Sequence, residues 1–126
     1  MNSPQFYVTP GFGELLRAQL GFSQAVRLGN RIETSGQGGW DDDFVIRTDL
    51  REEIVQAFDN VERTLAEAGA GWPDVIHLNS YHVPESSESI GASHNDVMVE
   101  QMRQRMGDRY PIWTQIGVPA LGAPGM

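Results

Sequence analysis

The 126-residue sequence contains neither cysteine nor lysine, and each absence excludes a class of chemistry. Without cysteine there is no disulfide, no thiol nucleophile and no cysteine-ligated zinc site. Without lysine, no side-chain amine can form a Schiff base with a carbonyl substrate. No apolar run approaches the roughly 18 residues of a membrane span, and no charged-then-apolar leader opens the chain. We therefore expect a soluble, cytoplasmic protein without a membrane partner.

Positive charge is also scarce. Nine arginines face 17 acidic residues, which gives a formal net charge of −8. Such a chain repels the phosphate backbone of a nucleic acid unless its arginines cluster, so we expect no nucleic-acid partner. With 40% apolar and 21% charged residues, the composition is that of one ordinary globular domain covering residues 1–126.

Strand-like patterns occur at several places along the chain. Residues 25–28 and 31–35 alternate around Gly29-Asn30, and this dipeptide is a two-residue hairpin signal because both residues tolerate positive φ. Further strands are predicted at residues 44–47, 75–83 and 112–118. The strand at 75–83 carries apolar and polar residues on both faces, which indicates that both of its faces are covered.

Two amphipathic helices are predicted, after a short first helix at residues 14–20. Asp49, followed by Glu52, is a capping-box-like start for the first of them, and Gly69 suits its end. Its apolar stripe consists of Ile54, Val55, Phe58, Val61, Leu65 and Ala68. The second helix is expected to open at Ser93, to end at Gly107 and to carry three methionines on one face: Met98, Met102 and Met106.

This order of elements predicts an α+β domain in which the two helices pack on one face of a mixed β-sheet. The opposite face of the sheet must then meet either solvent or another subunit. The two-sided pattern of residues 75–83 favours a second subunit, so we expect a homo-oligomer.

Several stretches together resemble the Rid/YjgF family, whose older label is the L-PSP endoribonuclease family. They are Phe22-Ser23-Gln24-Ala25-Val26, Gly29-Asn30, Thr34-Ser35-Gly36-Gln37, Asn60-Val61, Leu65-Ala66-Glu67-Ala68-Gly69, His94-Asn95 and Trp113-Thr114 with Ile116 and Val118. The resemblance implies a chorismate-mutase-like (YjgF-like) fold and a homotrimer with a central β-barrel, with a ligand cleft at each subunit interface. It also implies a final strand after the Gly/Pro-rich turn, and we expect this strand to be missing because the sequence stops at Met126.

The resemblance further implies a candidate small-molecule site. Well-studied family members are imine/enamine deaminases in which an arginine clamps the substrate carboxylate and a glutamate holds the attacking water. Carried over residue by residue, the substrate-binding positions are Phe22, Ser35, Gly36, Asn95 and Trp113. Trp113 replaces the arginine, Phe22 replaces a tyrosine, and the glutamate would lie beyond Met126. The chain therefore resembles an arginine-lacking subfamily, its catalytic residues stay unassigned, and no cofactor is implied.

Each of these positions also has an ordinary structural interpretation. Trp113 can be a core residue, Ser35 can end a strand, and Asn95 can satisfy free amides in the first turn of its helix. His77 and His82 lie an odd number of residues apart on a strand and face opposite sides, so they cannot share a metal. His94 stands alone in the sequence. We expect no metal site and no functional role for the three histidines.

Three functions are open at this point. The first is hydrolytic deamination of a reactive imine or enamine, or a related reaction, with the standard arginine replaced. The alternative is a non-catalytic ligand-binding or regulatory trimer. An endoribonuclease is disfavoured by the charge of −8, the absence of lysine and the absence of an obvious histidine pair.

Overall fold

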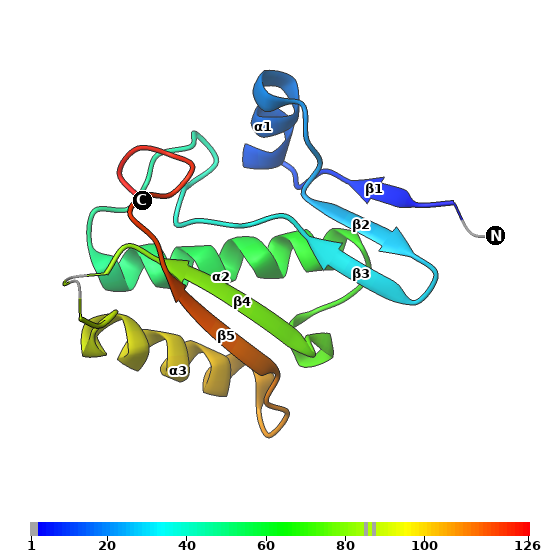
Figure 1. Ribbon diagram of the computed structural model, residues 1–126. Coiled ribbons are helices and arrows are strands. Elements are labelled where there is room, and N and C mark those ends of the chain that lie inside the picture. Colours follow the sequence, from blue (N-terminus) through cyan, green and yellow to red (C-terminus); the bar gives the residue numbers. More distant parts are fainter. Residues whose placement is uncertain (1–2, 85, 87) are drawn as a thin grey trace.

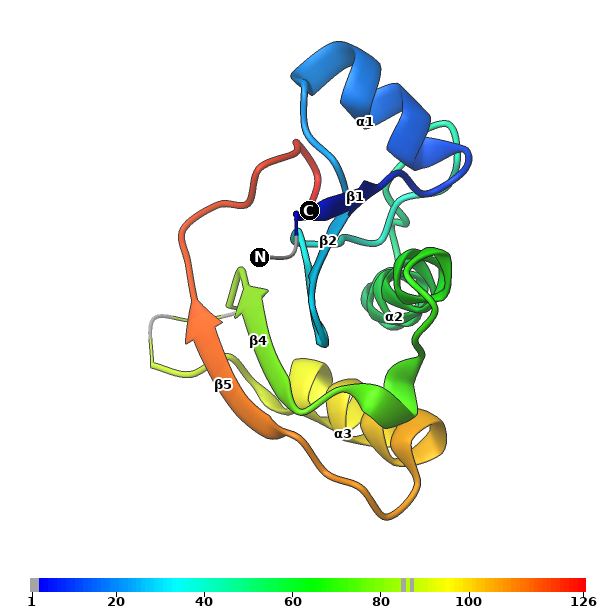
Figure 2. The same ribbon diagram turned by 90° about the vertical axis from the view of Figure 1, so that its right-hand side faces the viewer.

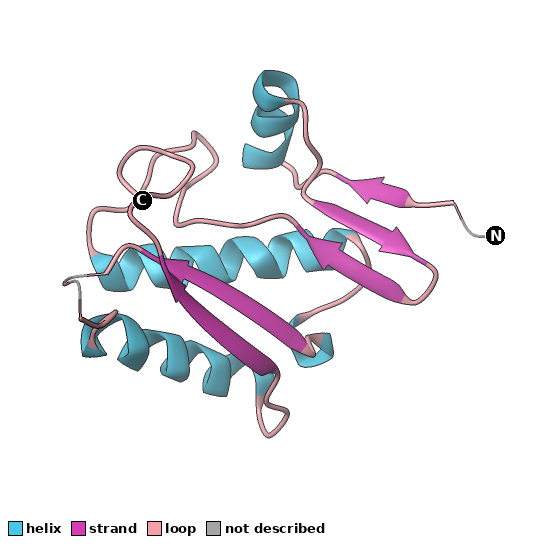
Figure 3. Cartoon of the chain, in the orientation of Figure 1, coloured by secondary structure: helices cyan, strands magenta, loops and turns pink. Residues whose placement is uncertain are grey.

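The computed structural model describes residues 3–84, 86 and 88–126. Strands and helices follow one another along the chain as Figure 1 and Figure 3 show. They are β1 (Gln5–Tyr7), α1 (Phe12–Leu20), β2 (Ala25–Leu28), β3 (Arg31–Thr34), α2 (Leu50–Glu67), the 3-10 turn Trp72–Asp74, β4 (His77–His82), α3 (Ala92–Met106) and β5 (Ile112–Gly117).

The predicted hairpin is confirmed. β2 and β3 pair antiparallel, with Leu28 opposite Arg31, and Gly29 in the turn has a φ of 60°. β1 adds to the other edge of β2, and this three-residue strand is too short to show a pattern in the sequence. The strand predicted at residues 44–47 is wrong. Phe44 has a φ of 62°, and only an isolated bridge joins Trp40 to Ile46, because the chain turns around the Asp41 side chain.

α2 begins and ends as predicted. The Asp49 carboxylate accepts the Glu52 backbone N–H at 3.0 Å, and Gly69 after the helix has a φ of 82°. In α3 the predicted methionine face is confirmed. The prediction that Ser93 caps this helix is wrong, because the N-cap is Gly91 and makes no side-chain capping bond. One core cluster joins both helices to the turn after α2: Ile54, Phe58, Trp72, Val97, Met98, Met102 and Met106.

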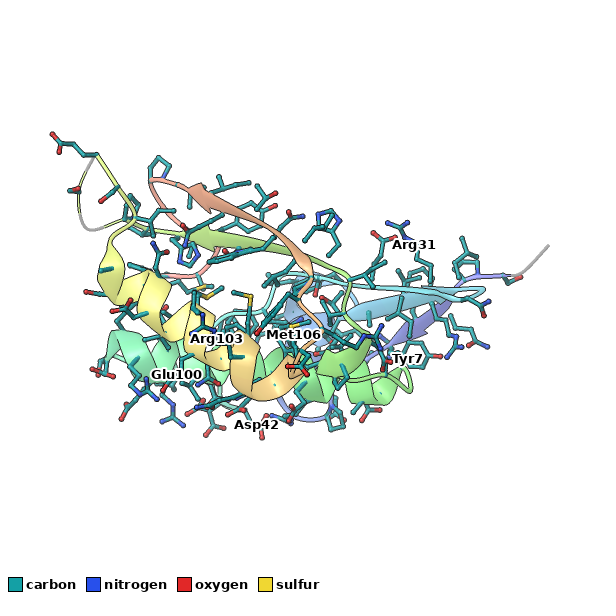
Figure 4. The ribbon with its side chains drawn as sticks, turned by 90° about the horizontal axis from the view of Figure 1, so that it is seen from below. Tyr7, Arg31, Asp42, Glu100, Arg103 and Met106 are labelled. Carbon is teal, nitrogen blue, oxygen red and sulfur yellow. The ribbon has the colours of Figure 1, made fainter. Side chains whose placement is uncertain are left out.

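The strands form one layer and the helices α2 and α3 the other (Figure 2). β4 pairs with β5 in parallel, with Leu78 opposite Trp113, and both side chains pack against the core cluster of the helices. Figure 4 shows the same two layers from below, with polar residues such as Asp42 and Glu100 at the outer rim. The predicted α+β class and helix layer are therefore confirmed.

The strands do not form the single mixed sheet that the pattern predicted. Across the described residues, the hydrogen-bonded ladders are a three-stranded antiparallel sheet, β1-β2-β3, and a separate two-stranded parallel sheet, β4-β5. The facing strands β3 and β4 are not neighbours in either ladder, as Figure 1 shows. The helices bridge this division, since α2 contacts β3 as well as α3.

A smaller cluster holds α1 against the loop after β3. Phe12 and Leu16 pack with Trp40, and Met126 contacts the same cluster. The Arg63 guanidinium on α2 also holds this region in place, because it donates to the Asp42 carboxylate at 2.9 Å and to the Pro10 carbonyl at 2.7 Å. No helix in the described part of the chain is long and apolar enough to cross a membrane.

Candidate functional site

Polar side chains gather on the helix-facing side of β4 and β5. Ser80 and His82 follow the core residue Leu78 at two-residue spacing, and Gln115 follows the core residue Trp113 in the same way. The parallel register places Ser80 opposite Gln115. These side chains therefore lie between the strand layer and α3, at the end of the sheet where α3 begins.

Trp113 has one core contact and one polar contact, both within the chain. Its ring packs against the core cluster, and its Nε1–H donates to Ser80 Oγ at 2.9 Å. The indole has only this one donor, so its single polar group is already engaged within the chain.

Asn95 lies in the first turn of α3, yet its side chain does not cap the helix. Its Oδ1 accepts from Gln115 Nε2 at 2.6 Å, which links the helix start to β5. Asn95, Gln115, Ser80 and Trp113 are all partly exposed in this chain.

Beneath these residues lies a histidine pair. His82 Nδ1 and His94 Nδ1 are 3.1 Å apart, and His82 Nε2 lies 2.8 Å from Ser80 Oγ. Only 6% of the His82 surface and 7% of the His94 surface is exposed. Burial, with a smaller contribution from the neighbouring His94, lowers the pKa of His82 to about 4, so His82 is neutral at pH 7.

The expectation that His94 stands alone is wrong, and so is the statement that the chain lacks a histidine pair. The two residues are 12 positions apart on different elements, and only the way α3 lies over β4 brings them together. The expectation that His77 and His82 face opposite sides is confirmed, because His77 is exposed whereas His82 is buried. No group of three or more His, Cys, Asp or Glu side chains within residues 3–84, 86 and 88–126 is arranged to hold a metal ion.

Phe22, Ser35 and Gly36 lie elsewhere, on the β1-β2-β3 sheet. A shallow hollow of about 580 Å³ is lined there by Phe6, Phe22, Glu33, Thr34 and Ser35 among others. The Ser35 hydroxyl donates to the Gln24 carbonyl at 3.3 Å and accepts from Gln37 Nε2 at 3.2 Å. Gly36 is exposed, and a Cβ added to it would meet no heavy atom within 4 Å.

The predicted binding residues therefore fall into two half-sites. Phe22, Ser35 and Gly36 form the hairpin half-site, and Asn95 and Trp113, with Ser80 and Gln115, form the strand–helix half-site. The two half-sites lie at different strand ladders, and no hydrogen bond between described residues connects the two groups.

A second hollow, of about 620 Å³, lies over the outer faces of α2 and α3. Two of the arginines that line it are paired with acids: Arg105 contacts Asp59 at 2.6 Å and Glu62 at 3.4 Å, and Arg51 contacts Glu100, whereas Arg47 donates to the Gln56 side chain at 3.4 Å. This surface is therefore an ordinary ion-paired helix exterior rather than an anion site.

Comparison with known proteins places the chain in a family. A family model described as endoribonuclease L-PSP matches residues 13–126. The RutC family protein YjgH of Escherichia coli K12 is 32% identical over 111 residues, which cover 88% of this chain and 81% of that protein. The chain belongs to the endoribonuclease L-PSP family, which is the Rid/YjgF family.

Two further relatives bear on the fold and the chemistry. A solved member of the YjgF/YER057c/UK114 family from Mycobacterium tuberculosis is 26% identical, covers 98% of this chain and 91% of its own, and superposes with a TM-score of 0.73. A protein of Dermatophagoides farinae named 2-iminobutanoate/2-iminopropanoate deaminase is 34% identical over 62 residues. That match spans 48% of this chain and 48% of the relative.

Proposed function

We propose that this chain hydrolyses a reactive imine or enamine, releasing a carbonyl compound and ammonia, in a cleft formed between subunits. Family membership and the named activity of the Dermatophagoides relative support this class of reaction. The observation that carries the proposal is the division of the candidate residues into two partly exposed half-sites on separate ladders. Two copies of the chain can supply one half-site each.

The assembly we propose is a homotrimer whose strand layers form a central barrel. Large apolar side chains are exposed on the strand layer or at its ends, among them Ile76, Tyr81 and Ile112, which are 74%, 51% and 68% exposed. A closed three-fold arrangement removes such a surface from water. Light scattering on the purified chain at micromolar concentration should give three times the monomer mass. A monomer would contradict the cleft as well as the assembly.

Trp113 determines which imines the cleft accepts. An indole carries no charge, and its N–H is already directed at Ser80, so it cannot neutralise a substrate carboxylate as a guanidinium does. A carboxylate that enters a partly buried site without a cation loses hydration without compensation. We therefore expect turnover of uncharged imines and weak binding of 2-imino acids.

The test uses imines generated freshly from several amino acids and amines, with ammonia and carbonyl product measured. Trp113→Arg should improve turnover of carboxylate-bearing imines by about 1–3 kcal/mol, the range of a charge-assisted contact. Asn30→Arg, in the exposed hairpin turn, adds the same charge away from both half-sites and should change nothing. A folded, trimeric Trp113→Arg variant without any gain would contradict the proposed position of the substrate.

A second candidate is a ligand-binding trimer without turnover. The same observation on Trp113 favours it, because the position of the family's clamping arginine holds a side chain whose one donor is engaged. Ligand binding by calorimetry without product release in the imine assay would select this function. The ribonuclease named by the family label is disfavoured by the net charge of −8, and RNA cleavage in metal-free buffer is its direct test.

A further inference from the structure

Ser80, His82 and His94 form a connected row of side chains. Ser80 Oγ lies 2.8 Å from His82 Nε2, and the opposite ring nitrogen of His82 lies 3.1 Å from His94 Nδ1. A hydroxyl, a histidine and a third group on the far nitrogen of that histidine are the arrangement by which proteins activate a serine. In this row the third group is a second histidine.

The neighbouring donors fix the direction of the row. The Trp113 Nε1–H can only donate, so it takes a lone pair of Ser80 Oγ and leaves the hydroxyl proton free to point elsewhere. Gln115 Nε2, which is also a donor, lies 3.5 Å from His82 Nε2. The Gln115 contact favours an unprotonated Nε2 on His82, which then accepts from the Ser80 hydroxyl. The proton of His82 is then on Nδ1 and is donated to His94 Nδ1.

We propose that Ser80 is a nucleophile, with His82 as its base and His94 as the group that orients His82, and that this site transfers acyl groups from small esters. The reaction differs from the proposed imine hydrolysis, in which water and not a side chain attacks, although Ser80 belongs to the same strand–helix half-site. Ser80 is partly exposed, whereas both histidines are buried, so of the three residues Ser80 is the one nearest to solvent.

The reaction balances with the groups present. The Ser80 hydroxyl proton passes to His82 Nε2 as Oγ bonds to the carbonyl carbon, and the electron pair of the C=O double bond moves to the carbonyl oxygen, which becomes the oxyanion. The ester C–O bond then breaks, and the alcohol leaves with the proton from His82. Water, deprotonated by the same nitrogen, hydrolyses the acyl-serine to a carboxylic acid and restores the hydroxyl.

The groups around His82 leave it in the form that accepts a proton. Ser80 on its own strand and Gln115 on β5 are uncharged, and His94 on α3 is the titratable group in contact with it. Because burial lowers the pKa of His82 to about 4, the base is available throughout the neutral range. The reaction should therefore be constant between pH 6 and 8 and fall only as the pH approaches 4.

The first experiment labels the intact, assembled chain with a fluorophosphonate probe and maps the modified residue by mass spectrometry. We expect modification at Ser80, and a labelling rate about 100-fold lower in His82→Asn, the typical loss when a general base is removed. Ser93→Ala, which removes an exposed serine of α3, should label like the wild-type chain. A wild-type chain that is unlabelled at Ser80, or labelling that survives His82→Asn, overturns the proposal.

The second experiment exploits the absence of cysteine. Ser80→Cys introduces a single thiol into the chain, and its rate of alkylation by iodoacetamide at pH 7 measures how far the neutral His82 assists its deprotonation. We expect this rate to fall about 100-fold when His82→Asn is added. The exposed thiol of Ser93→Cys should react at the same rate with and without His82→Asn. A Ser80→Cys alkylation rate that does not depend on His82 overturns the proposal.

These outcomes separate the two functions. Loss of Ser80 labelling leaves imine hydrolysis standing, because the imine assay measures ammonia release in the unmodified chain. Absence of imine hydrolysis leaves labelling and thiol alkylation unaffected, because neither uses an imine.

Discussion

The buried His82 makes the stability of this protein depend on pH in a specific window. Burial in the folded chain lowers the pKa of His82 to about 4, whereas an unfolded histidine has a pKa of about 6.5. Between these two values the unfolded state binds a proton that the folded state does not. Stability is therefore complete above about pH 6.5 and is lost progressively as the pH falls toward 4.

The magnitude follows from the two pKa values. One pH unit of difference corresponds to about 1.36 kcal/mol, so the whole window contributes about 3 kcal/mol at most. Between pH 7 and pH 5, which lies above the isoelectric point of 4.7, the expected loss is about 2 kcal/mol. This is a large fraction of the stability of a typical domain.

The assay is urea unfolding at pH 7, 6 and 5, at one fixed protein concentration because an oligomer's stability depends on concentration. Each pH is measured for the wild-type chain, for His82→Asn and for His77→Asn. The control His77 lies on the same strand but is exposed, so removing it should leave the pH dependence of the wild-type chain unchanged. His82→Asn should flatten it by about 2 kcal/mol over the two pH units.

The result that would refute this reasoning is a wild-type chain and a His82→Asn variant that lose stability in parallel from pH 7 to pH 5. His82 would then be hydrated or protonated in the folded state, and the row Ser80–His82–His94 would not contain a neutral base. If His82→Asn is already unfolded at pH 7, the wild-type chain provides the test by itself. An NMR titration of its His82 ring should show a midpoint near pH 4.

Three further substitutions test the packing that supports the site, each by the free energy of unfolding in urea. Phe58→Ala should cost about 3–5 kcal/mol, because it removes a buried ring stacked on Trp72 at 4.8 Å, and an unchanged midpoint would mean that α2 does not pack as described. Asn60→Ala should cost about 1–3 kcal/mol, because the buried Asn60 amide donates at 2.8 Å to two carbonyls of the loop after β3, and a neutral result would mean that water replaces it. Gly39→Ala should be destabilising by more than about 1 kcal/mol, because its Cβ would collide with the α2 backbone at the Glu53 carbonyl. The control Gly122→Ala, where a Cβ meets open space, should be near neutral, and equal effects of the two substitutions would contradict this close approach.

The local elements could be predicted from the sequence because each depends on neighbours in the chain. The capping residue Asp49, the apolar stripe around Phe58 and the turn at Gly29-Asn30 each act over a few positions, and the structure confirms all three. The strand at residues 44–47 failed for a related reason. Phe44 and Ile46 pack around Trp40 in an irregular loop, where a partly buried position does not require a strand.

The sequence by itself also determined the family, because the order and spacing of short motifs can be recognised without knowing which residues contact one another. It did not show that the strands divide into two ladders, or that Ser35 and Trp113 lie on different ones. Which residues share a half-site depends on strand pairing, and pairing joins segments that are far apart in the chain.

The histidine pair is the clearest case of a feature that only the tertiary structure decided. Alternation along β4 places Ser80 and His82 on one face, and that much is local. The contact of His82 with His94 requires that the first turn of α3 lie over the end of β4. A shift of two residues along β4 in the packing of α3 would still bury the same face of the strand, yet it would separate the two rings. Burial depends on the pattern of a face, whereas a hydrogen bond depends on the position of single atoms.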